Sequence, residues 1–458
     1  MGTTTNPQKH TSKHPPGLYL LFFTEMWERF SYYGMRGILV LYLTKELIEG
    51  GLGMNSTLAL TIYGFYTGAC YLSPLVGGWL SDMYLGKRFA ITLGGITMAL
   101  GNFVIFLGDA QWAMFTGLVL LIIGNGFFKP NISTLVGELY EENDPKRDSA
   151  FTIFYMGINL GAFFAPLIIA LVTDKIMGGM HGDVFVHGYK YGFLISSIGM
   201  VIGQILFNLL ANKYLGDLGK KPSRNEVVGD VEAKNRPLTA VEKQRTAAIL
   251  ILASIVIFFW AGFEQAGSSL TLYTDKFVDR TIFGFEIPTP WFQSVNPLFI
   301  ILLAPLVSML WTKLARSKRG DLPSPVKMAI GMILLGVGYM VLLIAVLGTG
   351  SNEEEIVNKA HIIFIVLTYF FHTLGELFLS PVGLSTVSRI APVKLASLLM
   401  GVWLASSGIA NILAGQLASV TQSLGYLEVF AAIGAMAILL GLVLLAFSKK
   451  IAKMMHVD

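Results

Sequence analysis

Long apolar runs recur along the whole chain and limit what it can fold into more than any other feature. A helix needs about 20 mostly apolar residues to cross a bilayer, whereas a membrane β-strand needs about 10 alternating ones. The runs here are of the longer kind and do not alternate, so membrane-spanning helices are predicted. Only 14% of the residues are charged, against about 25% in soluble proteins. This composition excludes a soluble multidomain enzyme and a disordered chain.

Twelve spans are predicted from these runs. They cover residues 18–44, 57–80, 89–108, 112–137, 149–173, 190–212, 246–270, 292–312, 326–348, 360–388, 396–421 and 427–448. The segment before the first span is polar and the span itself contains charges, so no cleavable signal peptide is expected. The single cysteine, Cys70, excludes an intramolecular disulfide. The predicted fold class is an all-α polytopic membrane protein.

Lysine and arginine are distributed unequally between the two sets of loops. With both termini placed in the cytoplasm, the inner segments contain roughly four times as many of these residues as the outer segments. Cytoplasmic loops of membrane proteins are enriched in lysine and arginine. Both termini are therefore expected in the cytoplasm, an arrangement that requires an even number of spans.

A polar segment in the middle of the chain divides the spans into two groups of six. It contains Pro222, Pro237 and charges of both signs but no apolar run. Two six-helix halves joined in this way are typical of transporters built from repeats. The expected parts are a cytoplasmic tail, an N-terminal bundle, a cytoplasmic linker, a C-terminal bundle and a second tail, at residues 1–14, 15–212, 213–245, 246–448 and 449–458.

Charged residues occur in the middle of only four spans, the first, fourth, seventh and tenth. Charges inside a bilayer are costly and usually functional, and this spacing predicts repeated three-helix units around a central polar cavity. The residues are Glu25, Glu28, Arg29, Arg36, Lys129, Glu264 and Glu376. The carboxylates outnumber the cations by one, so one bound proton would neutralise the set. This balance suits proton coupling.

The first span has a continuous polar stripe. Its polar residues fall within about 140° of arc on a helical wheel: they are Glu25, Glu28, Arg29, Tyr32, Tyr33 and Arg36. A stripe that covers about half of the hydrocarbon core must face water or polar partners. Arg36 and Glu264 lie past the middle of outward-running spans in opposite halves. They are predicted to pair and to close the outer side of the cavity.

Five motifs in the chain resemble those of the proton-dependent oligopeptide transporter (POT/PTR) family, bacterial type, within the major facilitator superfamily. The segment EMWERFSYYG at residues 25–34 matches the ExxERFxYYG signature of that family. The other four are GGWLSDMYLGKR, FYMGINLG, FWAGFEQ and GELFLSP, at residues 77–88, 154–161, 259–265 and 375–381. The resemblance extends over nearly the whole chain and implies the major facilitator fold, with 12 transmembrane helices in two bundles.

The resemblance also implies a function: proton-coupled import of di- and tripeptides by alternating access, with protons as the coupling ion, no cofactor or metal, and no enzymatic activity. The residues for proton coupling would be Glu25, Glu28, Arg29 and Glu264. The substrate-binding residues would be Arg36, Lys129, Glu376, Tyr32, Tyr33, Tyr71, Asn159, Trp260, Asn296 and Trp403. The gate residues would be Arg36, Glu264, Lys129 and Glu376. The expected location is the cell membrane, where a monomer would suffice.

Some of these residues also have a purely structural interpretation. Arg29 and Glu25 could form an i, i+4 pair that only stabilises the buried charges. Trp260 and Trp403 could be core or lipid-facing aromatics, and Asn159 could only bridge two helices. The function of this group is left open by the sequence alone.

The chain also departs from some relatives. Many bacterial members have two extra helices between the halves, for which residues 213–245 contain no apolar run. Animal members have a functional histidine on the second span, but this chain has no histidine between His14 and His181. Carboxylates are therefore expected to bind the coupling proton.

Other classes of membrane protein fit less well. A channel would show pore-lining rings or a filter, an enzyme a metal cluster or an activated nucleophile, and an ATP-driven pump a nucleotide-binding segment. Nothing in the sequence points to nucleic acid. The main alternatives keep the fold and change the cargo, to a small organic or inorganic anion, or to drugs exported in exchange for protons. An acidic Glu376 opposite Arg36 and Lys129 favours a zwitterion, such as a peptide or a peptide-like drug.

Overall fold

The computed structural model describes residues 14–108, 110–141, 144, 146–222, 237–317, 320–350 and 358–456. The predicted N-terminal tail, the middle of the predicted linker and the last two residues lie outside these ranges, apart from His14. Within the described residues the predicted all-helical architecture is confirmed, with twelve spans in two groups of six.

The N-terminal half contains the helices α1 (Pro16–Thr44), α2 (Ser56–Leu80), α3 (Lys87–Leu107), α4 (Gln111–Glu138), α5 (Arg147–Ala170) and α6 (Tyr189–Leu215). The C-terminal half contains α8 (Ala240–Phe263), α9 (Ser269–Phe277), α10 (Val295–Ala315), α11 (Ser324–Thr349), α12 (Ile363–Ile390), α13 (Ala396–Leu424) and α14 (Tyr426–Met455). Together α8 and α9 form one span. Judged by length and composition alone, ten of the twelve spans are long and apolar enough to cross a membrane. The remaining two, α1 and α2, pack among them.

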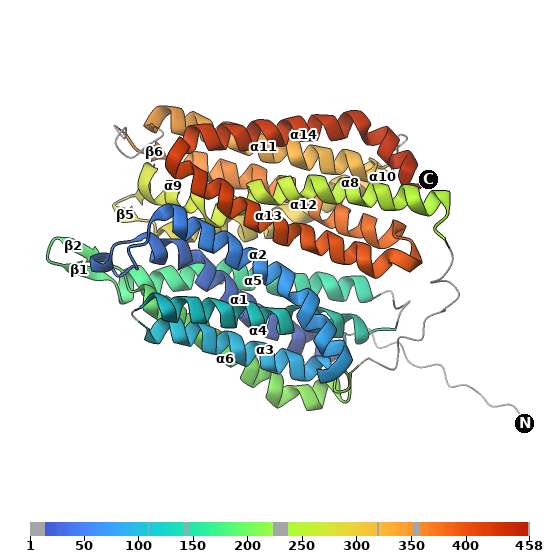
Figure 1. Ribbon diagram of the computed structural model, residues 1–458, viewed down its shortest axis with the longest axis horizontal. Helices are drawn as coiled ribbons and strands as arrows, with labels where there is room; N and C mark the ends of the chain where they lie inside the picture. Colours follow the sequence, from blue (N-terminus) through green and yellow to red (C-terminus); the bar gives the residue numbers. More distant parts are fainter. Residues whose placement is uncertain are drawn as a thin grey trace, which may run out of the picture.

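Three short two-stranded sheets lie at one end of the bundle, the left end in Figure 1. They pair β1 (Gly179–His181) with β2 (Val184–Val186), β3 (Val278–Asp279) with β6 (Ala360–His361), and β4 (Thr281–Ile282) with β5 (Phe285–Glu286). The first and last pairs are antiparallel, and the β3–β6 pair is parallel. We call this end the hairpin end. The opposite end, where α1 begins and α14 ends, is the terminal end.

Two helices extend further than the apolar runs predict. Helix α8 begins at Ala240 rather than at 246, because Thr239 caps it. The Thr239 hydroxyl accepts a hydrogen bond from the Glu242 backbone (3.2 Å), and the Glu242 carboxylate accepts one from the Thr239 backbone (2.8 Å). This reciprocal capping lets a helix start in polar sequence. Helix α14 continues to Met455 rather than ending at 448.

The seventh span is broken, where a continuous helix was predicted over 246–270. A 3-10 turn, η5 (Glu264–Gly267), separates α8 from α9. The Gln265 side chain donates hydrogen bonds to the carbonyls of Ala261 and Ala414, both at 3.0 Å. Side chains that bond to nearby backbone compete with regular helix. The break places Glu264 at a helix end inside the membrane-spanning region.

Each half has its own hydrophobic core. One core extends from Leu18 to Leu215, with Leu272 and Ala418 added from the other half, and the second extends from Ala248 to Met455. In the N-terminal half α1 packs on α5 and α6, and α3 packs on α4 and α6. In the C-terminal half α11 packs on α12 and α14, and α8 packs on α13. In Figure 1 the N-terminal half lies below the C-terminal half.

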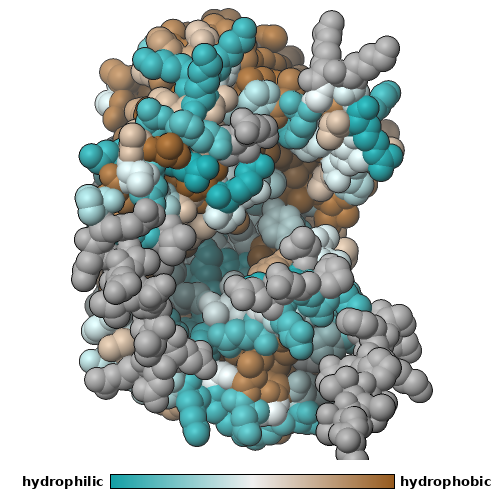
Figure 2. Space-filling view, turned by 90° about the vertical axis from the view of Figure 1, so that its right-hand side faces the viewer, coloured by the Kyte–Doolittle hydropathy of each residue, from teal (hydrophilic) through white to brown (hydrophobic). Residues whose placement is uncertain are grey.

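The halves touch most closely where α2 meets α13 (Figure 1). Gly64 faces Gly415 with no side chain between the two backbones, and Gly68 lies against the Gly408 carbonyl and the Ile412 side chain. At the terminal end a recess lined in part by hydrophilic residues lies between the halves (Figure 2). The structure therefore opens toward the terminal end.

We expect Gly64→Val to weaken the contact between the halves. A Cβ at position 64 would lie 2.5 Å from the Gly415 Cα, and overpacking of this kind costs typically about 1–3 kcal/mol. The expected result is a lower melting temperature of the purified protein. The matched control is Gly348→Val on α11, where an added Cβ meets no atom within 4 Å. Equal melting temperatures for the two variants would contradict the close approach.

Candidate functional site

The polar stripe of α1 faces the interior of the protein. Glu25, Glu28 and Arg29 are at most 4% exposed, and Arg36 is 9% exposed. The stripe is buried because α1 packs on α5 and α6 on one side and approaches α2, α4 and the C-terminal half on the other. The predicted arrangement of these residues around the interior is therefore present in the structure.

The part of the stripe nearer the terminal end forms a charge cluster with α4. The Arg29 Nε lies 3.0 Å from the Glu25 Oε1 and also donates to the Glu28 carboxylate. Lys129 of α4 interacts electrostatically with both carboxylates, and its Nζ lies 4.1 Å from the centre of the Tyr71 ring. We call Glu25, Glu28, Arg29 and Lys129 the α1–α4 cluster.

Three buried polar atoms of the α1–α4 cluster have no hydrogen-bond partner among the described residues. They are the Glu25 Oε2, the Glu28 Oε1 and the Arg29 Nη2. A buried polar atom without a partner costs free energy that a bound proton or a ligand group would recover. The two carboxylate oxygens are therefore suitable positions for a proton.

The predicted ion pair between Arg36 and Glu264 is present. It joins α1 of the N-terminal half to η5 of the C-terminal half, and both side chains are nearly buried. The Arg36 Nε also donates to the Tyr63 hydroxyl at 2.6 Å. Sequence reasoning missed Tyr63, because nothing in the sequence distinguishes it from the other tyrosines of the chain.

Glu376 of α12 is held by a hydrogen bond from α10. The Asn296 amide donates to the Glu376 carboxylate at 2.9 Å and to the Thr373 hydroxyl at 3.0 Å. Glu376 also interacts electrostatically with Tyr33 and Tyr155 of the N-terminal half. Within the described ranges, Glu376 has no ion-pair partner. Thr373 and Tyr155 were not predicted as site residues.

These contacts divide the seven charges into three groups. The α1–α4 cluster contains two carboxylates and two cations, and the Arg36–Glu264 pair contains one of each. Both groups are neutral when ionised. The surplus carboxylate that the sequence predicts is therefore Glu376, whose hydrogen-bond partner, Asn296, is neutral.

The aromatic residues predicted for the pocket occupy different positions. Tyr32 lies in the N-terminal core, with the Arg29 guanidinium 5.4 Å from its ring. Tyr33 is half-buried, and the Arg36 guanidinium lies 5.8 Å from its ring. Trp260 is half-buried and packs edge-on against Phe259 and Phe263.

Two other predicted residues make mainly structural contacts. Trp403 is 7% exposed and its indole packs against Gly383. The Asn159 amide donates to the Tyr155 carbonyl of its own helix at 2.9 Å. Neither residue makes a polar contact between the halves in the described structure.

Further bonds join the halves toward the hairpin end, and the sequence did not indicate them. The Trp291 indole donates to the Leu167 carbonyl (3.1 Å), and the Ser294 hydroxyl donates to the Phe163 carbonyl (2.8 Å). Lys129 and Glu376, the other two predicted gate residues, make no ion pair with each other in the described structure. The ionic and neutral bonds between the halves are thus found on the hairpin side.

Lys45, just beyond α1, adds an ion pair at the hairpin end. Its Nζ lies 3.1 Å from an Asp275 carboxylate oxygen of the other half. Burial acts to lower the pKa of Lys45, but the charge of Asp275 and the hydrogen bond to it raise the pKa by more. The raised pKa keeps Lys45 charged through neutral pH, and this charge is lost only in alkali.

Comparison with known proteins places the chain in a family. The POT family model matches residues 88–215 and 225–436. The peptide transporter YePEPT of Yersinia enterocolitica is 34% identical over 462 residues, which cover 88% of this chain and 87% of that protein. A di-/tripeptide transporter of Lactococcus lactis is 31% identical over 498 residues, which cover 96% of each.

Solved structures of similar proteins share the whole fold. A mutant of peptide transporter POT in complex with alafosfalin is 34% identical, with a TM-score of 0.86 and coverage of 98% of each chain. A POT family transporter in complex with 5-aminolevulinic acid is 31% identical, with a TM-score of 0.86 and coverage of 97% of this chain and 98% of that one. These matches show that the chain belongs to the POT family, and its membrane-spanning helices agree with a multi-pass transporter of the cell membrane.

Proposed function

We propose that this protein is a proton-coupled symporter that imports di- and tripeptides by alternating access. The terminal end would face the cytoplasm, protons would be the coupling ions, and no cofactor would be required. One observation supports this proposal most strongly: Glu376, which has no ion-pair partner among the described residues, lies on one half, while Arg36 and Lys129 lie on the other. A zwitterion with separated charges suits such a site.

The peptide would bind through its two termini. Its ammonium would lie near Glu376, the carboxylate without a cation, and would gain a charge-assisted hydrogen bond there. Its carboxylate would approach Arg36 or Lys129 on the N-terminal half. Half-buried aromatic rings such as Tyr33 and Trp260 offer apolar contact without fixed polar demands, so side chains of different sizes would be accepted.

Coupling would follow from competition for the same cations. A peptide carboxylate on Arg36 replaces Glu264 as its partner, and a proton on Glu264 weakens the same ion pair. Either event loosens a bond that holds the hairpin end closed. Protonation and binding would thus favour the same opening, and a ligand shifts a two-state equilibrium by its preference for one state.

The names of the relatives support this substrate class. The relatives from Yersinia enterocolitica and Lactococcus lactis are a peptide transporter and a di-/tripeptide transporter. The solved transporter that holds 5-aminolevulinic acid contains a ligand with an amine and a carboxylate. Transport of a simple anion would leave Glu376 without an attractive role, and drug export would not need opposed charges.

A competition assay tests the proposal. Purified protein in liposomes loaded with unlabelled dipeptide should take up labelled dipeptide by exchange. Di- and tripeptides should compete, and single amino acids, tetrapeptides and nitrate should compete poorly. Absence of dipeptide exchange, together with uptake of labelled nitrate into the same liposomes, would assign the protein to anion transport instead.

We expect N-acetylated dipeptides to compete much less well than free dipeptides. Acetylation removes the ammonium, and the loss of a buried charged partner typically costs about 2–5 kcal/mol. In the Glu376→Gln variant the difference between free and acetylated peptides should narrow. Asp183→Asn, an exposed carboxylate between β1 and β2, is the control and should leave the difference intact. Equal competition by both peptides in the unmodified protein would remove Glu376 from the pocket.

A further inference from the structure

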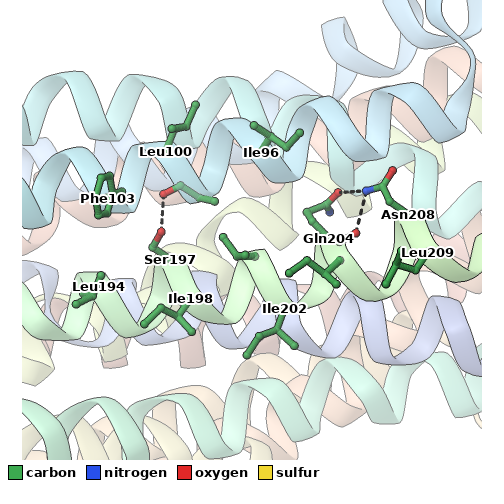
Figure 3. Close-up of a pocket in the computed structure, with 13 residues that line it drawn as sticks. Ile96, Leu100, Phe103, Leu194, Ser197, Ile198, Ile202, Gln204, Asn208 and Leu209 are labelled. Atoms are coloured by element: carbon green, nitrogen blue, oxygen red, sulfur yellow. Dashed lines mark hydrogen bonds between the residues drawn. The ribbon is translucent and has the colours of Figure 1, made fainter.

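A groove of about 720 Å³ runs between α3 and α6 on the surface of the N-terminal half (Figure 3). Its apolar walls consist largely of exposed residues, among them Ile96, Leu100, Phe103, Ile198 and Ile202. On a membrane-spanning bundle such exposed apolar walls face lipid. At the floor the helices approach closely, and the Ser197 hydroxyl donates to the Ala99 carbonyl at 2.8 Å. The groove is separate from the recess between the two halves.

Polar side chains interrupt the apolar surface toward the terminal end of the groove. The Thr92 hydroxyl donates to the Asn208 Oδ1 (2.9 Å), and the Asn208 amide donates to the Gln204 Oε1 (3.3 Å). Asn208 is exposed although it lies within the span α6. Gln204 is 6% exposed, and its Nε2 has no hydrogen-bond partner in the described chain. The exposed amide of Asn208 is costly in contact with hydrocarbon, so an occupant with a polar group beside Asn208 would be favoured.

Two cations follow these amides at the terminal end. Arg88 of α3 donates to the Asn212 side chain (2.7 Å) and to the Gly216 carbonyl (2.8 Å). Lys213 of α6 is exposed and lies about 7.5 Å along the helix axis beyond Asn208. The neighbouring Asp217 carboxylate is paired with Lys220 at 2.8 Å. The end of the groove is therefore suited to an anion.

The order of these groups matches the order of groups in a phospholipid. The apolar part of the groove, from Leu194 to Gln204, extends about 15 Å along α6, which is half of a hydrocarbon core of about 30 Å. Asn208 follows about 6 Å beyond Gln204 along α6, and the cations follow at the level of the phosphate. Basic residues beside a membrane attract anionic lipids.

We infer that this groove binds one anionic phospholipid from the leaflet at the terminal end. An acyl chain lies along the seam of α3 and α6, the ester oxygens lie near Asn208, and the phosphate lies near Arg88 and Lys213. The lipid closes the apolar gap between the two helices and places its ester oxygens beside the exposed Asn208 amide. This site is independent of the transported substrate.

Native mass spectrometry of the full-length protein in detergent micelles tests the inference. The probes are phosphatidylglycerol, phosphatidylcholine and diacylglycerol, added separately. The unmodified protein should retain one phosphatidylglycerol, and about tenfold less phosphatidylcholine or diacylglycerol. Lys213→Gln should reduce phosphatidylglycerol retention toward the phosphatidylcholine level, since it removes a cation at the phosphate.

Two further variants address the groove itself. Thr92→Val combined with Asn208→Leu removes the polar contacts and should lower retention about tenfold, and Ile198→Trp fills the groove and should abolish retention. Thr116→Val is the control, because Thr116 is exposed on α4 outside the groove. Melting temperatures identify any variant that fails to fold.

Three results would overturn the inference. One is equal retention of the three lipids by the unmodified protein, and another is unchanged phosphatidylglycerol retention in the double variant and in Ile198→Trp. The third is a dimer of the unmodified protein that becomes monomeric in Ile198→Trp without any bound lipid. That last result would assign the groove to contact with a second copy of the chain.

Discussion

Glu25→Gln and Glu28→Gln should each abolish the accumulation of peptide against its gradient while leaving peptide exchange intact. Both carboxylates lie in the α1–α4 cluster, and each has an oxygen without a hydrogen-bond partner in the described structure. Glutamine cannot bind the coupling proton. One proton that crosses about 100 mV supplies about 2.3 kcal/mol, equivalent to a gradient of about 45-fold. The variants should lose this factor.

Two measurements on the same liposomes separate coupling from binding. Net uptake of labelled dipeptide with an inward proton gradient reports coupling, and exchange against internal dipeptide without a gradient reports binding. Asp183→Asn should behave like the unmodified protein in both. Accumulation that persists in both single variants would exclude the two carboxylates as coupling groups, and loss of exchange in both would indicate a structural role instead.

Reversing the Arg36–Glu264 pair should restore closure of the hairpin end that each single substitution destroys. Arg36→Glu alone or Glu264→Arg alone places two like charges together in a buried position between the halves. Breaking a buried pair typically costs about 3–5 kcal/mol, enough to open this end. The double variant re-forms an ion pair of opposite orientation, so closure should return even though transport stays impaired.

A cysteine at position 271 can report this closure. Thr271 of α9 is 4% exposed, so a Cys placed there in a Cys70→Ala background should react slowly with a thiol reagent while the halves are joined. Labelling should be fast in each single charge variant and slow in the double variant. Fast labelling in all three would mean that the pair does not hold the halves together.

The general architecture was predictable because the bilayer leaves few solutions. Twelve apolar runs of helical length are enough to predict twelve spans, and the placement of Glu25, Lys129, Glu264 and Glu376 predicts which helices line the interior. The Arg36–Glu264 pair was also predictable, because both residues lie at similar depth in opposite halves. These inferences need only periodicity and position along a span.

The details that were missed depend on contacts between distant segments or on weak local signals. The partnership of Arg36 with Tyr63 and that of Asn296 with Glu376 depend on how helices pack. The break after Phe263 results from side-chain bonds of Gln265, which include one to Ala414. The early start of α8 was available in the sequence, because Thr239 followed by Glu242 is a capping signal. The prediction of spans from apolar runs alone did not include this signal, because the capping residues are polar.

Uptake driven by a proton gradient tests the central proposal most directly. Purified protein in liposomes that are acidic outside and neutral inside should accumulate a labelled dipeptide well above its external concentration. A protonophore should reduce the internal concentration to the external level, and N-acetylated dipeptide should not accumulate. Dipeptide uptake that stops at the external concentration, with or without the gradient, would contradict proton-coupled peptide import.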